Sequence, residues 1–447
     1  MYILKKILFF VLILESRLIL AKYKPFIIAV TGSVGKTSTK DAIFDVLKDQ
    51  SRYVRKSDKS FNSEIGLPLT VIGVPNAWHD ISGWMNNVMA GVRLIFRTNE
   101  YPDCLVLEIG ADHPGDIKKV AAWLHPDISV ITQISATPVH VEFFASPEEV
   151  FEEKAALATA VKEGGTLILF ADNEKVAGLA QRVQGRNVNV ISFGTVETAK
   201  VRGVEEKVVY EIVDSNSEPV IANPNPKSPS GLTFKLVIDA ETAQVSIPGI
   251  IGSSYMYPLL AAASVGIARG VPMTSIAEGL NRYNAPKGRM HLIPGMNGST
   301  LIDDTYNSSP DAASSALKTL RNIECSGTKI AVLGDMMELG QYASDEHRKI
   351  GKEAASVAGL LVTVGQRSRA TADEALKGEL IADKVRSFDS SVEAAEYLKT
   401  VITPGDVVLI KGSQSIRMEK AVALLMKDPT QAEKLLVRQE VEWLAKK

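Results

Sequence analysis

The sequence is poor in cysteine and carries no excess of charge of either sign. Cys104 and Cys325 are the only cysteines among 447 residues, which excludes a disulfide framework and a cysteine-rich metal site. We therefore expect a reducing, cytoplasmic compartment. The formal net charge of -2 gives no sign of the basic surface with which proteins bind nucleic acid. Internal repeats and low-complexity tracts are also absent.

A long apolar run is missing too, although a short one lies near the N-terminus. Ile7–Leu14 is the longest candidate, and eight helical residues span only about 12 Å of a hydrocarbon core of about 30 Å. No small-residue cleavage pattern follows, which disfavours a signal peptide. Two interpretations of the N-terminal apolar helix at residues 1–24 stay open. It either packs on its own domain or lies at a membrane surface, held there by Lys5, Lys6, Lys22 and Lys24.

What is present is the composition of a globular protein with more than one domain. Hydrophobic residues make up 45% and charged residues 23% of the chain, far from the signature of disorder. The length exceeds what one hydrophobic core usually supports. Proline and glycine cluster at Asn284–Gly288, which indicates a hinge. After the N-terminal helix we therefore predict a central domain at 25–285 and a C-terminal domain at 286–447.

Short β-rich apolar runs alternate with helical stretches, which predicts an α/β fold with mostly parallel sheets. In the central domain, strands are expected at Phe26–Thr31, Cys104–Ile109, Ile128–Ile134, Thr166–Phe170 and Val188–Phe193. In the C-terminal domain, strands are expected at Thr300–Ile302, Lys329–Leu333, Leu360–Val364 and Val407–Ile410.

Three regions depart from this alternation. A hairpin-bearing appendage with antiparallel strands is expected at Val208–Val213, Thr233–Val237 and Gln244–Ile247. Its turn is Asn223–Gly231, which is rich in proline, asparagine and serine. An Ala-rich helix at Leu259–Arg269 follows, with Gly270 as its C-cap. The charged residues after Asp428 predict a solvated terminal helix.

A phosphate-binding loop directly follows the first expected strand. Its glycines allow backbone N–H groups to approach phosphate oxygens, Lys36 supplies a positive charge, and Thr37 offers a hydroxyl to Mg²⁺. Val30 stands where the standard spacing has a glycine. Because the strand, the loop and the helix Ser38–Leu47 follow in the required order, nucleotide binding is predicted at Gly32, Ser33, Val34, Gly35, Lys36, Thr37 and Ser38.

Further motifs resemble the Mur ligase family, in particular its D-alanyl-D-alanine-adding branch. TGSVGKTSTK is similar to the family's phosphate loop, and the resemblance extends over roughly residues 25–425. The segments that carry it are FNSEIGLPLT (Phe61–Thr70), LEIGADHPGDI (Leu107–Ile117), VHVEFFASPEEVFEEK (Val139–Lys154), GRMH (Gly288–His291), DDTYNSSPDA (Asp303–Ala312), VLGDMMELG (Val332–Gly340) and KGSQSIRMEK (Lys411–Lys420). The fold that the resemblance implies is a P-loop ATPase-like, mostly parallel sheet domain followed by a Rossmann-like α/β domain.

The resemblance also implies residue roles. Two Mg²⁺ ions are expected at Thr37, Glu108, His140 and Lys154, with Lys154 carrying a carbamate and Glu142 supporting His140. The expected catalytic residues are Lys36, Glu108, His140, Lys154 and Arg289. ATP is expected to contact the phosphate loop, Arg289, Asp304, Tyr306 and Asn307.

Plainer interpretations of the same residues remain. Without the resemblance, Glu108 is a solvated strand-end acid, His140 a satisfied histidine and Lys154 an exposed lysine of a charged stretch. Asn307–Pro310 is equally compatible with a structural turn. On the other hand, Ser146 followed by Pro147 and two glutamates predicts a helix start that places Lys154 on the third turn.

The function that the resemblance implies is an ATP-dependent amide-bond ligase that works through an acyl phosphate and adds D-alanyl-D-alanine to a peptidoglycan precursor. Its partners would be small molecules, and we expect a cytoplasmic monomer with a peripheral membrane contact through residues 1–24 left open. Two alternatives also stay open. One is a related ligase with a folate, cyanophycin or lipid-linked acceptor, and the other is a nucleotide-binding scaffold without catalysis.

The chain also departs from the family's pattern. Family members that act on uridine-nucleotide precursors carry a further N-terminal domain, whereas about 24 residues precede the first expected strand here. We therefore expect that domain to be absent. Ser254, Tyr255 and Pro258 stand in the stretch where the family has His and Asn, and Gln133 replaces an Asn. These departures put the adenine contacts and the substrate in question more than the chemistry.

Overall fold

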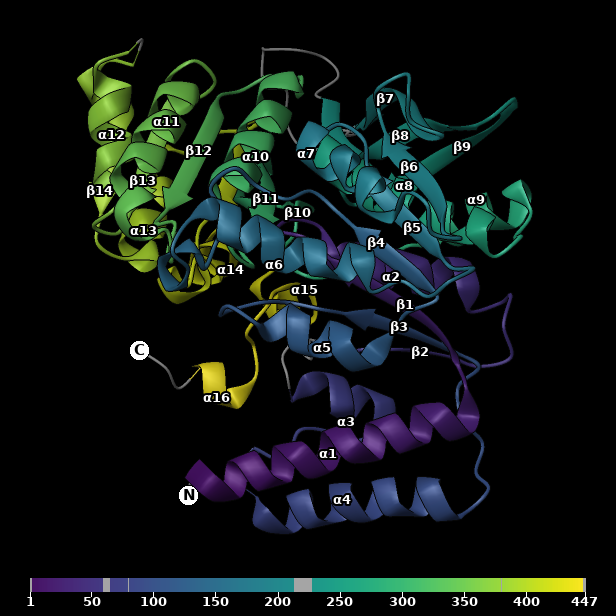
Figure 1. The fold of residues 1–447 in the computed structure, drawn as a ribbon. Helices are drawn as coiled ribbons and strands as arrows, with labels where there is room; N and C mark the ends of the chain where they lie inside the picture. Colours follow the sequence, from purple (N-terminus) through teal and green to yellow (C-terminus); the bar gives the residue numbers. More distant parts are fainter. Residues whose placement is uncertain (1, 59–64, 79, 213–226, 379, 445–447) are drawn as a thin grey trace.

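The structure is a computed structural model that describes residues 2–58, 65–78, 80–212, 227–378 and 380–444. Two α/β units follow each other along the chain, each built on its own sheet (Figure 1). The first four residues of the motif Phe61–Thr70 and the first four of the turn Asn223–Gly231 lie outside the described residues, as do the side chains of Lys5 and Lys6.

The first sheet has nine strands in the order β2-β3-β1-β4-β5-β6-β7-β8-β9. Its parallel part consists of β1 (Phe26–Thr31), β2 (Val54–Lys56), β3 (Cys104–Glu108), β4 (Ile128–Ile131), β5 (Thr166–Phe170) and β6 (Asn189–Gly194). Every residue of β3, β4 and β5 is buried, as expected for parallel strands covered on both faces. The predicted strands of this unit are all present, and β2 is an addition of three residues.

Strand β1 lies between β3 and β4, and these three strands are parallel. The chain therefore leaves β1 toward one side of the sheet and later crosses to the other side. The crevice at the carboxyl ends of strands beside such a switch point is where α/β proteins usually bind ligands. The first helix after β1 is α2 (Lys36–Leu47), so the predicted phosphate loop occupies this crevice.

The antiparallel strands predicted after residue 200 are present, but the prediction that they form a separate appendage is wrong. Strands β7 (Val201–Ile212), β8 (Lys227–Ile238) and β9 (Glu241–Pro248) are antiparallel to each other, but β7 pairs with β6 and so extends the main sheet. The pairing between β6 and β7 is parallel and short, Phe193 with Val201 and Gly194 with Arg202. A pairing of two residues on each strand is too short to produce a recognisable hydrophobic pattern in the sequence.

Helices surround this sheet. They are α3 (Gly66–Ile72), α4 (Ile81–Phe96), α5 (Asp116–Leu124), α6 (Pro147–Thr159), α7 (Glu174–Ala177), α8 (Ser253–Ala268) and α9 (Met273–Asn281). Helix α8 corresponds to the predicted Ala-rich helix but begins six residues earlier, before Pro258. It packs against α2, which brings its first turn beside the phosphate loop.

The N-terminal helix α1 (Tyr2–Tyr23) packs against α3 and α4. Leu12 and Ile19 are fully buried in this contact, which confirms that α1 packs on its own unit. None of the helices in the described part of the chain is both long and apolar enough to cross a bilayer.

The second sheet has six strands in the order β10-β11-β15-β12-β13-β14. They are β10 (His291–Pro294), β11 (Thr300–Asp304), β12 (Lys329–Gly334), β13 (Leu360–Val364), β14 (Val385–Phe388) and β15 (Val407–Lys411), and only β10 is antiparallel to its neighbour. Around them lie α10 (Pro310–Asn322), α11 (Ala343–Ala355), α12 (Arg369–Leu376), α13 (Ser391–Val401) and α14 (Glu419–Leu425). Four of these strands match the prediction, whereas β10 and β14 are additions.

The end of the chain is not the solvated helix that was predicted. It forms two short helices, α15 (Ala432–Leu435) and α16 (Val441–Leu444), which are joined by residues 436–440 and lie one after the other in Figure 1. Leu436 and Arg438 of this region are buried. The local cause is an ion pair, because Arg438 Nη1 lies 3.0 Å from Oε2 of Glu419, which is itself buried.

Candidate active site

A cleft of about 600 Å³ lies between the two units. The phosphate loop, Glu108 and the first turn of α8 form one wall, and residues after β11, β12 and β15 form the other. Of the predicted nucleotide contacts, the cleft is lined by Ser33, Val34, Gly35, Lys36, Thr37, Ser38, Arg289, Asp304, Tyr306 and Asn307. Residues as far apart in the sequence as Ser33 and Trp443 thus face one cavity.

The phosphate loop depends on its two glycines. Gly32 has φ 151°, and a Cβ there would lie 1.9 Å from Oγ1 of Thr132, so no side chain fits. Gly35 has φ 85° and is the N-cap of α2, a conformation that glycine adopts at little cost. The carbonyl oxygen of Gln133 accepts hydrogen bonds from the N–H groups of Ser33 at 2.7 Å and Val34 at 3.3 Å. The loop is therefore tied to the end of β4.

Lys36, Thr37 and Glu108 come together at the base of this loop. Thr37 Oγ1 donates a hydrogen bond of 3.2 Å to Oε1 of Glu108, and Lys36 Nζ donates one of 3.0 Å to the carbonyl oxygen of Gly32. Burial lowers the pKa of Lys36, and the nearby Glu108 carboxylate opposes that shift. Glu108 is itself only 6% exposed, so it is not a solvated acid. A hydroxyl and a buried carboxylate are oxygen ligands that suit Mg²⁺.

Lys154 is buried on α6, with 4% of its surface exposed. The helix begins as predicted, because the Ser146 side chain accepts a hydrogen bond from the Glu149 N–H and Pro147 occupies the first turn. Burial, and next the like charge of Lys36, lower the pKa of Lys154 to about 7. The interpretation of Lys154 as an exposed lysine is therefore wrong. With a pKa of about 7, a substantial fraction of this amine is neutral near neutral pH, and the neutral form can act as a nucleophile.

His140 lies where the two units meet. Its Nδ1 is 2.8 Å from Oε2 of Glu338, and its Nε2 is 3.5 Å from Oδ1 of Asp112. The hydrogen bond from His140 lowers the pKa of Glu338. The family resemblance implies Glu142 as the supporting carboxylate, but the carboxylate hydrogen-bonded to His140 is that of Glu338, from the loop after β12.

On the opposite wall, Asp304 ends β11 and is paired with Lys411 at the end of β15. Nζ of Lys411 lies 2.7 Å from Oδ2 of Asp304 and donates 3.0 Å to the carbonyl oxygen of Asn307. Both charged side chains are buried. The guanidinium of Arg289 lies over the Tyr306 ring, 4.3 Å from its centroid. Its buried Nε has no hydrogen-bond partner, and a phosphate oxygen could provide one.

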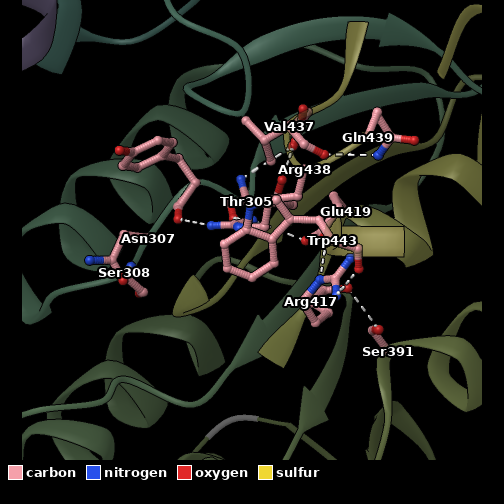
Figure 2. A network of polar contacts seen from close by, with 12 residues as sticks. Thr305, Asn307, Ser308, Ser391, Arg417, Glu419, Val437, Arg438, Gln439 and Trp443 are labelled. Atoms are coloured by element: carbon pink, nitrogen blue, oxygen red, sulfur yellow. Dashed lines mark hydrogen bonds and ion pairs between the residues drawn. The ribbon is translucent and has the colours of Figure 1, made fainter. Parts of the chain in front are cut away.

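The C-terminal tail supports this wall, as Figure 2 shows. Arg438 points toward the turn after β11 and donates hydrogen bonds to the carbonyl oxygens of Thr305, at 3.1 Å, and Tyr306. The carbonyl of Trp443 accepts a hydrogen bond of 2.9 Å from Arg417, and Trp443 also lines the cleft. The tail therefore helps to build the cavity.

The structure thus gathers the predicted residues in three groups. Lys36, Thr37 and Glu108 lie together at the base of the phosphate loop, Arg289 to Asn307 lie across the cleft, and His140 lies at the junction of the units. Lys154 is close enough to Lys36 and Asp112 to interact electrostatically. No group of three or more His, Cys, Asp or Glu side chains is placed to hold a metal in the part of the chain that the structure describes.

Several residues of the cleft were not predicted, namely Glu338, Lys411, Ser413, Gln414 and Trp443. Glu338 and Lys411 stand in motifs that resemble the family, VLGDMMELG and KGSQSIRMEK, so their position at strand ends was a usable signal. Trp443 had no such signal because its contacts with Arg417 and Arg438 form only in the folded chain.

Comparisons with known proteins agree with this arrangement. Residues 30–266 match the model of the Mur ligase middle domain, and residues 288–414 match that of the Mur ligase glutamate ligase domain. The UDP-N-acetylmuramoyl-tripeptide–D-alanyl-D-alanine ligase of Bacillus subtilis is 28% identical over 90% of this chain and 76% of its own length. The Mycobacterium tuberculosis protein of the same name is 30% identical, over 90% of this chain and 73% of its own. The structure of MurF ligase from Thermotoga maritima in complex with ADP has a TM-score of 0.73 at 23% identity, covering 94% of this chain and 83% of that one.

Proposed function

The chain belongs to the Mur ligase family, and from this membership we propose that it is an ATP-dependent ligase that forms an amide bond. We propose as its substrates a UDP-N-acetylmuramoyl-tripeptide, which supplies the carboxylate, and D-alanyl-D-alanine, which supplies the amine. The names of the curated relatives support this choice. The observation that carries the proposal is the single cleft in which the phosphate loop faces Asp304 and Arg289.

The reaction would proceed in two steps. An oxygen of the substrate carboxylate attacks the γ-phosphorus of ATP. The bond between this phosphorus and the β,γ-bridging oxygen breaks, so that ADP departs and the substrate becomes an acyl phosphate. The amine then attacks the acyl carbon, phosphate departs, and the amine loses a proton to give the amide. Catalysis of such phosphoryl transfer is mostly positioning and electrostatic stabilisation, which the loop N–H groups, Lys36 and Arg289 are placed to supply.

Magnesium fits the residues at the base of the loop. Thr37 and Glu108 offer the hydroxyl and the carboxylate, already 3.2 Å apart. When bound, the ion would neutralise charge on the phosphates and the transferred group. We propose a second ion near His140, and for it an anionic ligand formed when the neutral Lys154 amine adds carbon dioxide and releases a proton. Burial of Lys154 beside the positive Lys36 supports this carbamate, because both features favour the neutral amine.

Both units must meet for the cleft to be complete. His140 and Glu338 join them at one end, and Gln133 donates a hydrogen bond of 3.2 Å to Asp311 at the other. We propose that this closed arrangement excludes water from the acyl phosphate, and that the linker around Asn284–Gly288 is the hinge. Opening about that hinge would admit the substrates and release the products.

The test is a matrix of ADP-release assays with purified chain, in which each candidate carboxylate is combined with each candidate amine. The proposal expects ADP release and amide formation only when the muramoyl tripeptide and D-alanyl-D-alanine are both present. Turnover with folate and glutamate, with a cyanophycin primer or with a lipid-linked acceptor would instead identify a related ligase. Nucleotide binding without amine-dependent turnover in any combination would identify a scaffold.

A further inference from the structure

Two helices at one end of the molecule form a parallel pair that lies away from the cleft. In Figure 1, α1 and α4 run side by side at the edge of the first unit. Lys22 near the end of α1 donates hydrogen bonds of 2.8, 3.0 and 2.6 Å to the carbonyl oxygens of Leu94, Ile95 and Arg97 at the end of α4. These three hydrogen bonds fix how the two helices lie along each other, and they give partners to carbonyl oxygens that the end of α4 would otherwise leave without one.

The outward sides of both helices expose large apolar side chains. On α1 they recur at the three- and four-residue spacing of one helix face, at Ile7, Phe10, Leu14 and Leu18. On and before α4 they are Trp78, Ile81, Met85, Met89 and Phe96. Phe10 is 67% exposed, Ile81 73% and Phe96 82%. We call these nine residues the α1/α4 face. Soluble proteins rarely leave such a group of apolar side chains in water unless it binds something.

The exposed charged residues of α1 and α4 themselves are basic. Arg17 on α1 and Arg93 on α4 are exposed, as is Arg97 directly after α4. The sequence of α4 contains no acidic residue, and the single acid of α1 is Glu15, which is buried rather than presented to solvent. Two exposed acids lie near the pair: Asp80, whose side chain caps the α4 N-terminus, and Asp103, which lines a pocket together with Arg17. A partner with negative charge and an apolar interior would complement this surface.

We propose that the α1/α4 face docks on the surface of an anionic lipid bilayer. Helices that lie in a membrane interface combine Phe, Trp, Leu and Met side chains on one side with Lys and Arg at the headgroups, and this pair does the same. The two helices would lie flat on the bilayer rather than cross it. A second copy of the chain fits less well because a symmetric contact would bring the same arginines toward each other.

The test is co-sedimentation of the full chain with vesicles. One set consists of phosphatidylcholine alone, and the other of phosphatidylcholine and phosphatidylglycerol in equal amounts. We expect binding to the anionic vesicles that weakens as salt is added. The double variant Phe10→Ser/Phe96→Ser should lower the partition coefficient about tenfold or more. The matched control is Ile381→Ser, because Ile381 is 63% exposed on the C-terminal unit; it should bind like the unchanged chain.

A second pair of variants tests the charges. Arg17→Gln/Arg93→Gln should remove most of the preference for anionic vesicles while leaving ADP release in solution and the circular dichroism spectrum unchanged. The proposal is overturned if the unchanged chain binds neither vesicle, or if the double serine variant binds as well as the control. It is also overturned if light scattering finds a dimer that Phe96→Ser converts to a monomer, since a second copy would then cover the face.

Discussion

Glu338 of the C-terminal unit accepts a hydrogen bond from Nδ1 of His140 in the central unit, with the two atoms 2.8 Å apart. This contact leaves Nε2 of His140 facing Asp112. A carboxylate on one imidazole nitrogen orients the ring and makes the other nitrogen a better metal ligand. The pair therefore links the approach of the two units to the geometry of the proposed second metal site.

The first prediction concerns this contact. Glu338→Gln keeps the shape of the side chain but removes its charge, so the His140 ring should be held less firmly. We expect the half-saturating Mg²⁺ concentration for ADP release to rise about 10- to 100-fold, and direct Mn²⁺ binding measured by calorimetry to weaken in parallel. Glu142→Gln is the matched control, because it makes the same change two residues from His140 without a contact to the ring. Equal effects of both variants would contradict the assignment.

The second prediction concerns the base of the phosphate loop. Lys36→Ala and Glu108→Ala should each lower the rate of amide formation by about a thousandfold or more, because positioning and charge stabilisation provide most of this chemistry. Lys175→Ala serves as the control, since that lysine is paired with Glu148 on the surface. Near-normal turnover in either loop variant would show that the site is assigned wrongly.

The third prediction tests the carbamate on Lys154. Lys154→Ala should lose most activity, about a hundredfold or more, and regain part of it when short carboxylates are added, because these can occupy the place of the carbamate. Lys154→Arg should remain inactive, since a guanidinium cannot add carbon dioxide. The rate of amide formation is the measurement.

Two outcomes would decide against the carbamate. A fully active Lys154→Arg variant would exclude it outright. An inactive Lys154→Ala variant that carboxylates fail to rescue would point instead to a structural role, and the thermal midpoint of that variant would then have to fall as well.

The fourth prediction follows from Glu15, whose carboxylate is buried between α1 and α4 with Oε2 lacking a hydrogen-bond partner. Burial raises its pKa from 4.5 to about 7. The folded chain therefore holds a proton that the unfolded chain releases between these values, so this group makes stability fall as pH rises from 4.5 to about 7. Above that range, Glu15→Gln should be more stable than the unchanged chain by about 2 kcal/mol.

Denaturant unfolding at pH 5 and pH 8 measures this effect as a difference between variant and unchanged chain. The two should be nearly equal in stability at the lower pH, where Glu15 is protonated and resembles glutamine. Glu100→Gln, at a surface glutamate paired with Arg52, should show no such divergence. A difference that stays constant across the pH range would refute the role given to Glu15.

The fifth prediction concerns the C-terminal tail. Arg438→Gln removes the buried charge that holds Glu419 and the turn after β11, which should cost about 2 kcal/mol of unfolding free energy. The cost is moderate because Arg417 still contacts Glu419, with Nε 2.5 Å from Oε1. Since Tyr306 lies in that turn, KM for ATP should rise several-fold. Lys434→Gln, at an exposed lysine, should change neither the unfolding free energy nor KM. An unchanged KM in Arg438→Gln would show that the C-terminal tail does not influence the nucleotide site.

Strands buried on both sides could be predicted from sequence with the most accurate bounds. Thr166–Phe170 and Leu360–Val364 match β5 and β13 residue for residue, because each is a short, continuous apolar run without competing signals. β14 could not be found in this way. It is an edge strand whose middle residues are Arg386 and Ser387, so its pattern resembles a loop.

Within the candidate site, motif residues could be predicted but their partners could not. Asp304 was expected to contact ATP, yet its pairing with Lys411 depends on the register of β11 against β15, which local sequence does not encode. Arg438 presents the same difficulty. It stands in a charged stretch that favours solvent, and only the fold reveals that Glu419 and two backbone carbonyls surround it.

The two-sided apolar character of α1 has a consequence for synthesis of the chain. α1 is complete at Tyr23, whereas α4, which covers one of its sides, does not begin until Ile81. At about 5–20 residues per second, a ribosome needs several seconds for the intervening stretch. During that interval both sides of α1 lack their native covering. The nascent helix therefore leaves the ribosome with apolar side chains uncovered on both sides, and a chaperone or a lipid surface can bind it before α4 has been synthesised.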